Sequence, residues 1–282
     1  MIYKKLISIS FLLALTACNE EEVDLHFADG DIPYEIVVQG GVCSVMGKQL
    51  VYISKPMSVN DTIAIPVSNA TVEVSDGQNA YAYCETENAG EYASIDEFAG
   101  KVGKTYSIMI EYEGRKYFGS DNMVECDSIQ VEYLPVSVTL YKDIIDHIEI
   151  NQADHTFGYK SRNIWINGYI IDTVPSPSII YSWDHTYTHS VTYPQGVFQT
   201  RDVTYGFGGR PDDYIRFVKM SVSDNYYKYL ISKLNLTEWA SGTFSTIPDN
   251  VYTNMSKGCT GYFFASDVKI LTVQCKNLLV LQ

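Results

Sequence analysis

The sequence predicts a mainly β protein with two β-rich domains, the second of which carries one helix. Tyrosine is unusually abundant, with 23 copies among 282 residues, and tyrosine, like valine, isoleucine and threonine, favours the half-buried surface of a pleated sheet. Short apolar or alternating segments recur between turn signals at regular spacing, which is typical of β-sandwiches. Hydrophobic residues make up 46% and charged residues 19% of the chain, so its composition is that of a folding chain and not of a disordered one.

Residues 1–17 have the pattern of a bacterial lipoprotein signal peptide. Lys4 and Lys5 precede a short apolar stretch, Leu6–Leu15, which is too short to span a bilayer comfortably. It runs into Leu15-Thr16-Ala17-Cys18, and small residues before a cysteine are what the lipoprotein signal peptidase requires. We therefore predict that Cys18 is acylated and becomes the first residue of the mature chain. The alternative is an ordinary signal peptide with a chance cysteine at its end.

Residues 18–30 are acidic and aperiodic, and we interpret them as a tether. Within this segment Glu20, Glu21 and Glu22 form an acidic run just after the lipid site. The run resembles the surface-export signal of Bacteroidota lipoproteins, which predicts an outer-membrane protein that faces the cell surface. The alternative is a solvated spacer that holds the body of the protein off a membrane facing the periplasm.

Residues 31–128 are predicted to form a β-sandwich domain. Asp76-Gly77 and Glu113-Gly114 are turn signals within it. Strands are expected at residues 35–40, 49–54, 71–74, 80–84, 91–94, 103–110 and 115–119. Three of these segments, PVSNATVEV (66–74), AGEY (89–92) and GKTYSIMIEYEGRKYFG (103–119), resemble the transthyretin-type, carboxypeptidase-regulatory-like sandwich, which has an Ig-like architecture. The resemblance implies a domain without chemistry of its own.

Residues 129–282 are predicted to form a second β-rich domain with a helix near residues 224–236. Strands are expected at 129–141, 163–171, 186–193, 215–222, 259–264 and 268–273. Ser223 or Asp224 can cap the helix, because a short polar side chain accepts hydrogen bonds from the first N–H groups. The apolar stripe predicted for its buried face follows the spacing i, i+3, i+4, i+7 and consists of Tyr227, Leu230, Ile231 and Leu234.

Five cysteines remain besides Cys18: Cys43, Cys84, Cys126, Cys259 and Cys275. Because their number is odd, they cannot all pair within the chain. The envelope is oxidising, so disulfides between Cys84 and Cys126 and between Cys259 and Cys275 are open alternatives. The other alternative is that each cysteine serves as a small buried hydrophobic residue.

The C-terminal part carries the most specific resemblance. The helical segment NYYKYLISKL (225–234) is followed by TIPDNVYTNMSKGCTGYFFASDV (246–268), with an Asn-x-x-x-Gly step and a Gly-Tyr-Phe strand. Together with the lipobox and the segments VVQGG (37–41) and PVSNATVEVSDG (66–77), these features resemble the domain-of-unknown-function 4249 family of Bacteroidota lipoproteins. The usual family loop reads Asn-Ile-x-Asn-Gly, and residues 251–258 depart from it. The resemblance implies an outer-membrane location and genes beside those of TonB-dependent receptors, but no catalytic residues.

Candidate chemistry is sparse in the sequence. His185 and His189 share one face of a predicted strand but lie about 13 Å apart at ~3.3 Å per residue, too far for one metal ion. An acidic and histidine-containing cluster is interpreted as a solvated loop and edge: Asp146, His147, Glu149, Asp154 and His155. We find no nucleophile elbow, zinc-protease motif or phosphate-binding glycine loop. The sequence therefore predicts no enzyme, no cofactor and no metal site.

Three short segments match the acceptor pattern for O-glycosylation in Bacteroides-type envelopes. Their hydroxyl residues are Thr62, Ser128 and Thr173, each preceded by aspartate and followed by an aliphatic residue. A pattern of three residues also arises often by chance.

The leading hypothesis is a non-enzymatic, lipid-anchored protein of the outer membrane that assists a TonB-dependent receptor in ligand capture or uptake. With 34 acidic against 20 basic side chains, the chain would repel a phosphate backbone, so nucleic acid is not an expected partner. The alternative is a surface glycan-binding or adhesive module that uses exposed aromatic residues, among which Trp165, Trp183 and Trp239 are candidates.

Overall fold

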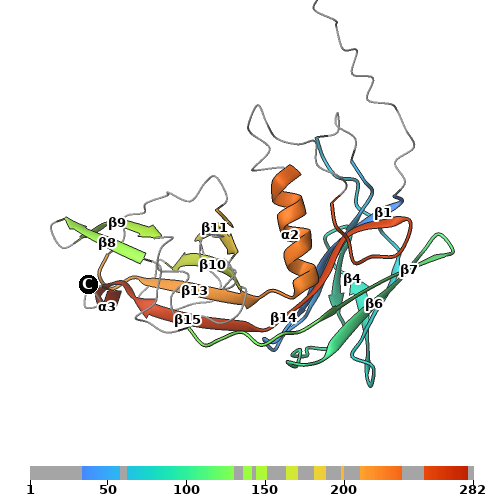
Figure 1. Cartoon of the computed structure of the whole chain (residues 1–282), viewed down its shortest axis with the longest axis horizontal. Helices are drawn as coiled ribbons and strands as arrows, with labels where there is room; N and C mark the ends of the chain where they lie inside the picture. The colour runs from blue at the N-terminus through green and yellow to red at the C-terminus, as the bar shows by residue number, and fades with distance from the viewer. Residues whose placement is uncertain are drawn as a thin grey trace, which may run out of the picture. The chain divides into compact units, whose positions relative to one another are not determined.

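The computed structural model of the chain describes residues 34–57, 62–129, 136–141, 144–150, 163–170, 181–188, 198–199, 210–236 and 251–278. Strands far outnumber helices within these residues, which confirms the mainly β class (Figure 1). The predicted signal peptide and acidic tether lie outside the described residues. None of the helices in the described part of the chain is long and apolar enough to cross a membrane.

The strands of the first half agree closely with those predicted for residues 31–128. They are β1 (Ile36–Cys43), β2 (Leu50–Ser54), β3 (Thr71–Ser75), β4 (Ala80–Glu85), β5 (Glu91–Ser94), β6 (Thr105–Tyr112) and β7 (Arg115–Asn122). The turn signal Asp76-Gly77 also has its expected effect, since the Asp76 carboxylate accepts hydrogen bonds from the backbone N–H groups of Gln78 and Asn79 at 2.9 and 2.7 Å.

The second half supplies the remaining elements. They are β8 (Val136–Tyr141), β9 (Ile144–Ile150), β10 (Asn163–Ile170), β11 (Tyr181–Thr188), β12 (Phe198–Gln199), β13 (Tyr214–Ser221), α2 (Asp224–Leu236), β14 (Cys259–Ser266), β15 (Val268–Gln274) and α3 (Cys275–Leu278). Two expectations need correction. Asp146, His147 and Glu149 lie not in a loop but in β9, an edge strand that pairs with β8, while Asp154 and His155 lie outside the described residues. The strand expected at 186–193 begins earlier, at Tyr181.

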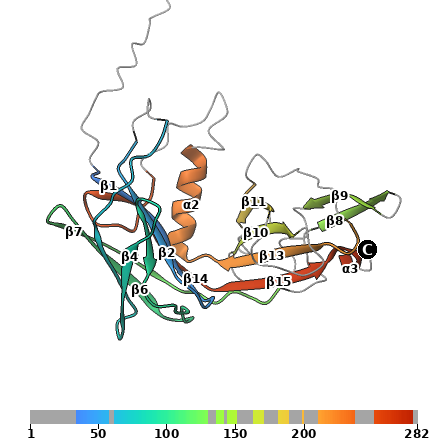
Figure 2. The ribbon, with the colours of Figure 1, turned by 180° about the vertical axis from the view of Figure 1, so that it is seen from behind.

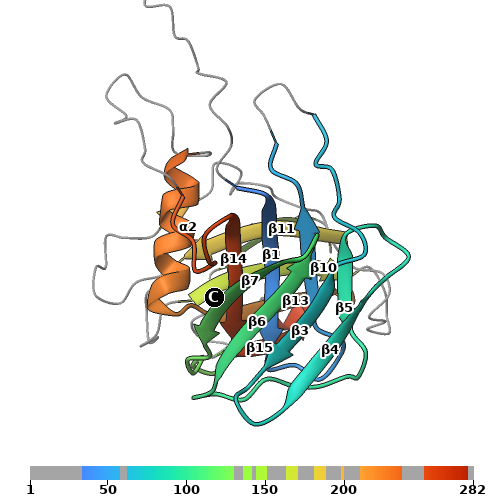
Figure 3. The same cartoon turned by 90° about the vertical axis from the view of Figure 1, so that its right-hand side faces the viewer.

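Eight strands form one sheet in the order β14-β1-β2-β5-β4-β3-β6-β7. Where the sequence predicted a two-layer sandwich, hydrogen bonding joins these strands into a single sheet. The edge strands β14 and β7 lie beside each other, so the sheet nearly closes on itself (Figure 3). The sheet predicted from residues 31–128 thus includes a strand from the predicted second domain.

The interior of this sheet is the core of the protein's first half. Side chains alternate along β6, where Tyr106, Ile108 and Ile110 are buried and Thr105 and Ser107 are exposed. The buried cluster is contributed by most of the eight strands and includes Ile36, Val38, Val51, Ile53, Val72, Val74, Tyr117 and Phe263. Burial of these apolar side chains from several distant segments is the main favourable contribution to folding.

The first and the last strand of this sheet along the chain, β1 and β14, pair with each other in parallel. Val38 lies opposite Gly261 and Gly41 opposite Phe264. At both glycines the strands approach so closely that a β-carbon would overlap a carbonyl oxygen, that of Phe264 for Gly41 and that of Val38 for Gly261. Gly261 also has a φ of +90°, a conformation that residues with a β-carbon rarely adopt.

Helix α2 begins at the predicted cap, and it packs on β14 through two tyrosines that lie outside the predicted apolar stripe. Ser223 Oγ accepts a hydrogen bond from the Tyr226 N–H at 3.0 Å, which confirms the predicted N-cap. The ring centroids of Tyr226 and Tyr229 each lie 5.0 Å from that of Tyr262 on β14. Aromatic stacking on the outer face of β14 therefore orients the helix, and Tyr227 is only partly buried.

A second sheet has the order β12-β11-β10-β13-β15. Its strands pair in antiparallel fashion, and β13 and β15 lie side by side (Figure 2). β15 follows β14 after one residue, Asp267, so the chain passes from the first sheet to the second almost without interruption.

The close approach of β1 and β14 yields a stability prediction. Gly261→Ala should lower the free energy of unfolding by about 3–5 kcal/mol, because it adds a backbone clash to an unfavourable φ. Gly77→Ala is the matched control, since Gly77 has a φ of +83° with open space around it and should cost only about 1–2 kcal/mol. Urea denaturation measures both values, and equal losses would contradict the close approach at Gly261.

Candidate functional site

The predicted lipidation and export residues cannot be placed. Cys18, Glu20, Glu21, Glu22 and the acceptor Thr173 lie outside the described residues. Two other predicted O-glycosylation residues are described, and both Thr62 and Ser128 are exposed. Exposure is what a modifying enzyme requires of its acceptor hydroxyl.

The disulfide alternatives are wrong for the described cysteines. No disulfide joins any of Cys43, Cys84, Cys126, Cys259 and Cys275. Cys84 is exposed on β4, whereas Cys126 is buried where the two sheets meet. Burial confirms the other alternative for Cys126, Cys259 and Cys275, and it raises the pKa of each of these thiols to about 12. A thiol with so high a pKa is a poor nucleophile at neutral pH.

A metal centre is not apparent in the part of the chain that the structure describes. Among those residues, no group of three or more histidine, cysteine, aspartate or glutamate side chains is arranged to hold a metal ion. His185 lies in β11, in agreement with the expected strand, while His189 lies outside the described residues.

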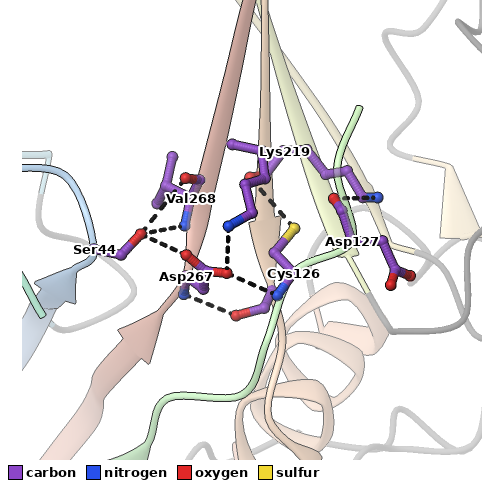
Figure 4. Close-up of polar contacts among 8 residues, drawn as sticks. Ser44, Cys126, Asp127, Lys219, Asp267 and Val268 are labelled. Carbon is purple, nitrogen blue, oxygen red and sulfur yellow. Dashed lines mark hydrogen bonds and ion pairs between the residues drawn. The ribbon is translucent and has the colours of Figure 1, made fainter. Parts of the chain in front are cut away.

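The densest polar cluster surrounds Asp267, the residue between β14 and β15 (Figure 4). Its carboxylate accepts hydrogen bonds from the Ser44 hydroxyl at 2.6 Å and from the Cys126 N–H at 2.9 Å. The Lys269 ammonium lies 2.9 Å from the same carboxylate. The backbone of Asp267 exchanges two further hydrogen bonds with Ser221 at the end of β13. We call this set of contacts the Asp267 joint.

Electrostatics keep the Asp267 carboxyl ionised despite its burial. Burial alone raises the pKa of this group, but the hydrogen bonds from Ser44 and Cys126 and the ion pair with Lys269 outweigh it, so the pKa lies below its ordinary value. Beside the joint, Lys219 is fully buried and its ammonium donates a hydrogen bond to the Asp127 carbonyl oxygen at 3.0 Å. Burial lowers the pKa of Lys219 to about 8.

A second buried carboxylate, Asp121, links β7 to the start of α2 and to β14. It accepts hydrogen bonds from the Ser223 hydroxyl at 2.7 Å and from the Ala265 N–H at 3.1 Å. Burial is the largest influence on this group and raises its pKa. The contacts of both buried carboxylates connect strands to neighbouring segments of the chain, which is the arrangement of a structural joint.

The seam between β7 and β14 is closed by residues 254–256. Asn254 donates hydrogen bonds to the carbonyl oxygens of Ser120 on β7 and Phe263 on β14 at 2.8 and 2.7 Å, and it accepts one from the Phe263 N–H. Ser256 exchanges two hydrogen bonds with the backbone of Phe118 on β7. The side chain of one asparagine thus bridges the two edges of the eight-stranded sheet.

An open groove of about 410 Å³ lies over β6 and β7, beside the residues 254–256 that close this seam, within the range of about 300–1,000 Å³ that is common for ligand sites. Phe118 stands beside it with 52% of its surface exposed. The other lining residues include the hydroxyl side chains Ser107, Ser120 and Ser256. An exposed ring beside hydroxyl groups can stack against a flat apolar face and donate hydrogen bonds to its polar rim. This seam groove is the candidate binding site.

The sequence model of one family matches residues 20–271 of the chain. The chain belongs to the DUF4249 family, whose description is a domain of unknown function. A search of curated proteins finds no match. The structure gives physical roles to segments that carried the family resemblance: VVQGG lies in β1 and the Gly-Tyr-Phe segment in β14, and these strands pair.

Sequence reasoning missed the joint and the groove. Asn254 is the asparagine of the Asn-x-x-x-Gly step that resembles the family. Its bridging role depends on β7 and β14, and β7 is more than a hundred residues away in the chain. One signal for the joint is visible in hindsight. Residues 259–274 form a strand-like run without glycine or proline near Asp267, and a carboxylate within such a run, with no turn around it, is expected to be buried and bonded.

The lowered pKa of Asp267 yields a prediction on acid stability. A group whose folded pKa is depressed contributes stability that is present above its unfolded pKa of about 3.9 and is lost as the pH falls through the folded value. Asp267→Asn should lower the free energy of unfolding by about 3 kcal/mol at pH 6, and its difference from the wild type should shrink below pH ~4. Denaturation at several pH values measures this difference.

Asp212→Asn is the control for that experiment, because Asp212 pairs with Lys276 at the exposed surface and should cost at most about 1 kcal/mol. A difference between wild type and Asp267→Asn that stays constant from pH 6 to pH 3 would contradict an ionised carboxylate in the joint.

Proposed function

We propose that the protein is a non-enzymatic, lipid-anchored protein of the outer membrane that faces the cell surface and assists a TonB-dependent receptor in ligand capture or uptake. The observation that carries this proposal is the complete lipobox ending at Cys18, followed by the acidic run Glu20, Glu21 and Glu22. Acyl chains on Cys18 would anchor the chain, and the tether would hold the β-rich body near receptors at high effective concentration.

A non-catalytic role is supported by how the reactive groups are used. The buried carboxylates Asp121 and Asp267 serve strand junctions, and the buried thiols have raised pKa values. A weakly polar, open groove fits capture of a ligand better than its chemical conversion, which needs converging acid, base or nucleophilic groups. Ser128 and Thr62 are both exposed, as an acceptor of an O-linked glycan must be, and we propose such a glycan at Ser128.

The partner proposal predicts the outcome of affinity purification. Tagged wild-type protein, solubilised in mild detergent, should recover one TonB-dependent receptor in a fixed ratio, and it should carry acyl mass on Cys18. Cys18→Ser should leave the outer-membrane fraction and recover no receptor, because it lacks the anchor that concentrates it there. Wild type without acyl mass would contradict the anchor, and acylated wild type without any receptor would contradict the accessory role alone.

The glycan-binding alternative is favoured by one specific observation, the exposed Phe118 ring beside the hydroxyl-lined seam groove. The tryptophans named as candidates, Trp165, Trp183 and Trp239, have no described side chains. In this alternative the ring stacks on the apolar face of a sugar, while Ser107, Ser120 and Ser256 face its hydroxyl groups.

Titration calorimetry with a panel of neutral hexose oligosaccharides tests the alternative. If one of them binds, Phe118→Ala should weaken its affinity about tenfold, since loss of ring stacking costs on the order of 1 kcal/mol. Tyr52→Ala is the matched control, because Tyr52 is 50% exposed on β2, away from the seam. Equal effects of both variants, or no binding by wild type, would contradict a saccharide site at the groove.

A further inference from the structure

The connection between β2 and β3 exposes apolar side chains to an unusual degree. Ile63 is 80% and Ile65 65% exposed, and Met57 is also exposed. Two aliphatic side chains this exposed within three residues are unfavourable in water. Such a group of side chains commonly marks a surface that is covered in the working protein.

The backbone on both sides of this connection is held by hydrogen bonds. The Lys55 N–H donates a hydrogen bond to the Ile65 carbonyl oxygen at 2.7 Å, and the Val67 N–H donates one to Ile53 at 2.9 Å. Val67 is buried in the core, two residues beyond the exposed Ile65. The two arms of the connection are therefore paired by backbone hydrogen bonds, with Val67 buried in the core and Ile65 exposed to solvent.

The connection lies at the end of the first sheet where the chain enters it. Val37, near the start of β1, is paired with Ser54, at the end of β2. Figure 3 shows the start of β1 and the β2–β3 connection at the same end of the sheet. The chain that leads back from Tyr34 to Cys18 is thus attached at the end that carries Met57, Ile63 and Ile65.

We propose that Met57, Ile63 and Ile65 form a membrane-contact site that rests in the interface of the lipid bilayer. This inference rests on the proposed acylation of Cys18. Acyl chains on Cys18 would draw this end of the sheet towards the bilayer and would bring these exposed apolar side chains towards the lipid. Shallow insertion of a few apolar side chains adds to a lipid anchor and fixes which end of the protein faces the membrane.

The opposite end of the sheet offers a matched comparison. Met46, in the connection between β1 and β2, is 66% exposed, the same as Ile65 within one per cent. The antiparallel pairing of β1 and β2 places Met46 at the far end from Ser54. Met46 and Ile63 are both well exposed, at 66% and 80%, so a comparison of these two positions at opposite ends separates the effect of position from that of hydrophobicity.

Thr62 introduces a competing hypothesis for the same segment. As a predicted O-glycosylation acceptor it would carry a hydrophilic glycan directly beside Ile63. A glycan on Thr62 would keep the segment out of the bilayer interface. O-glycosylation of Thr62 and membrane contact of Ile63 therefore exclude each other.

A photo-crosslinking experiment on the full-length, acylated protein in its native membrane tests the proposal. A diazirine amino acid replaces Ile63 in one preparation and Met46 in another; both positions are exposed, so neither probe disturbs the core. We expect lipid adducts at position 63 in excess over position 46 by on the order of tenfold, because a side chain in the interface meets acyl chains and a distal one does not. Mass spectrometry identifies each adduct and also measures the acyl mass on Cys18.

The outcomes separate the proposal from the anchor on which it rests. Lipid adducts at 63 but not at 46 support the membrane-contact site. Protein adducts at 63, equal lipid adducts at both positions, no adduct at 63, or a glycan on Thr62 would overturn it while acylation of Cys18 stands. Absence of acyl mass on Cys18 would instead overturn the anchor itself and the proposal with it.

Discussion

The Asp267 joint is the constraint on which the rest of the structure depends. The chain leaves the first sheet at Ser266 and enters the second at Val268, so one residue must serve strands of both. Its backbone bonds to Ser221 of the second sheet, while its carboxylate accepts hydrogen bonds from Ser44 and Cys126, which follow strands β1 and β7 of the first sheet. A buried carboxylate is costly unless its oxygens are fully bonded, and here each oxygen accepts a hydrogen bond from a different segment. The joint therefore forms only when all of these segments are in place.

The same interdependence appears at the closure of the first sheet. β14 must pair with β1 across more than two hundred residues of sequence, and Asn254 must then bridge β14 to β7. Neither contact can form locally, so the eight-stranded sheet lacks its edge strand until β14 pairs with β1. Contacts of such long sequence separation slow folding and couple distant segments to one another. The β-rich halves that the sequence pattern separates are thus connected through β14.

This coupling explains what the sequence could and could not predict. Strands β1 to β7, the Asp76 turn and the Ser223 cap follow from signals within a few residues, and all were predicted correctly. The β1–β14 pairing, the seam groove and the Asp267 joint depend on which distant segments meet, and a single sequence carries no local signal for that. The buried face of α2 is an intermediate case. Helical periodicity is compatible with packing through the Tyr227 stripe or through Tyr226 and Tyr229. The structure has the latter, because the Tyr262 ring of β14 stacks against Tyr226 and Tyr229.

The chain enters and leaves the first sheet at opposite ends. The chain enters at the end that holds Tyr34 and Ile65, and it leaves for the second sheet at the other end, where Ser266 is paired with Cys43. If the entering end is anchored by lipid, the second sheet is attached at the end away from the anchor, and the seam groove lies on the wall between them. A protein built in this way can hold one end at a membrane while it offers the wall and the far end to ligands or receptor loops. The parallel pairing of β1 with β14 creates this polarity, because both strands run from the end where the chain enters the sheet towards the joint.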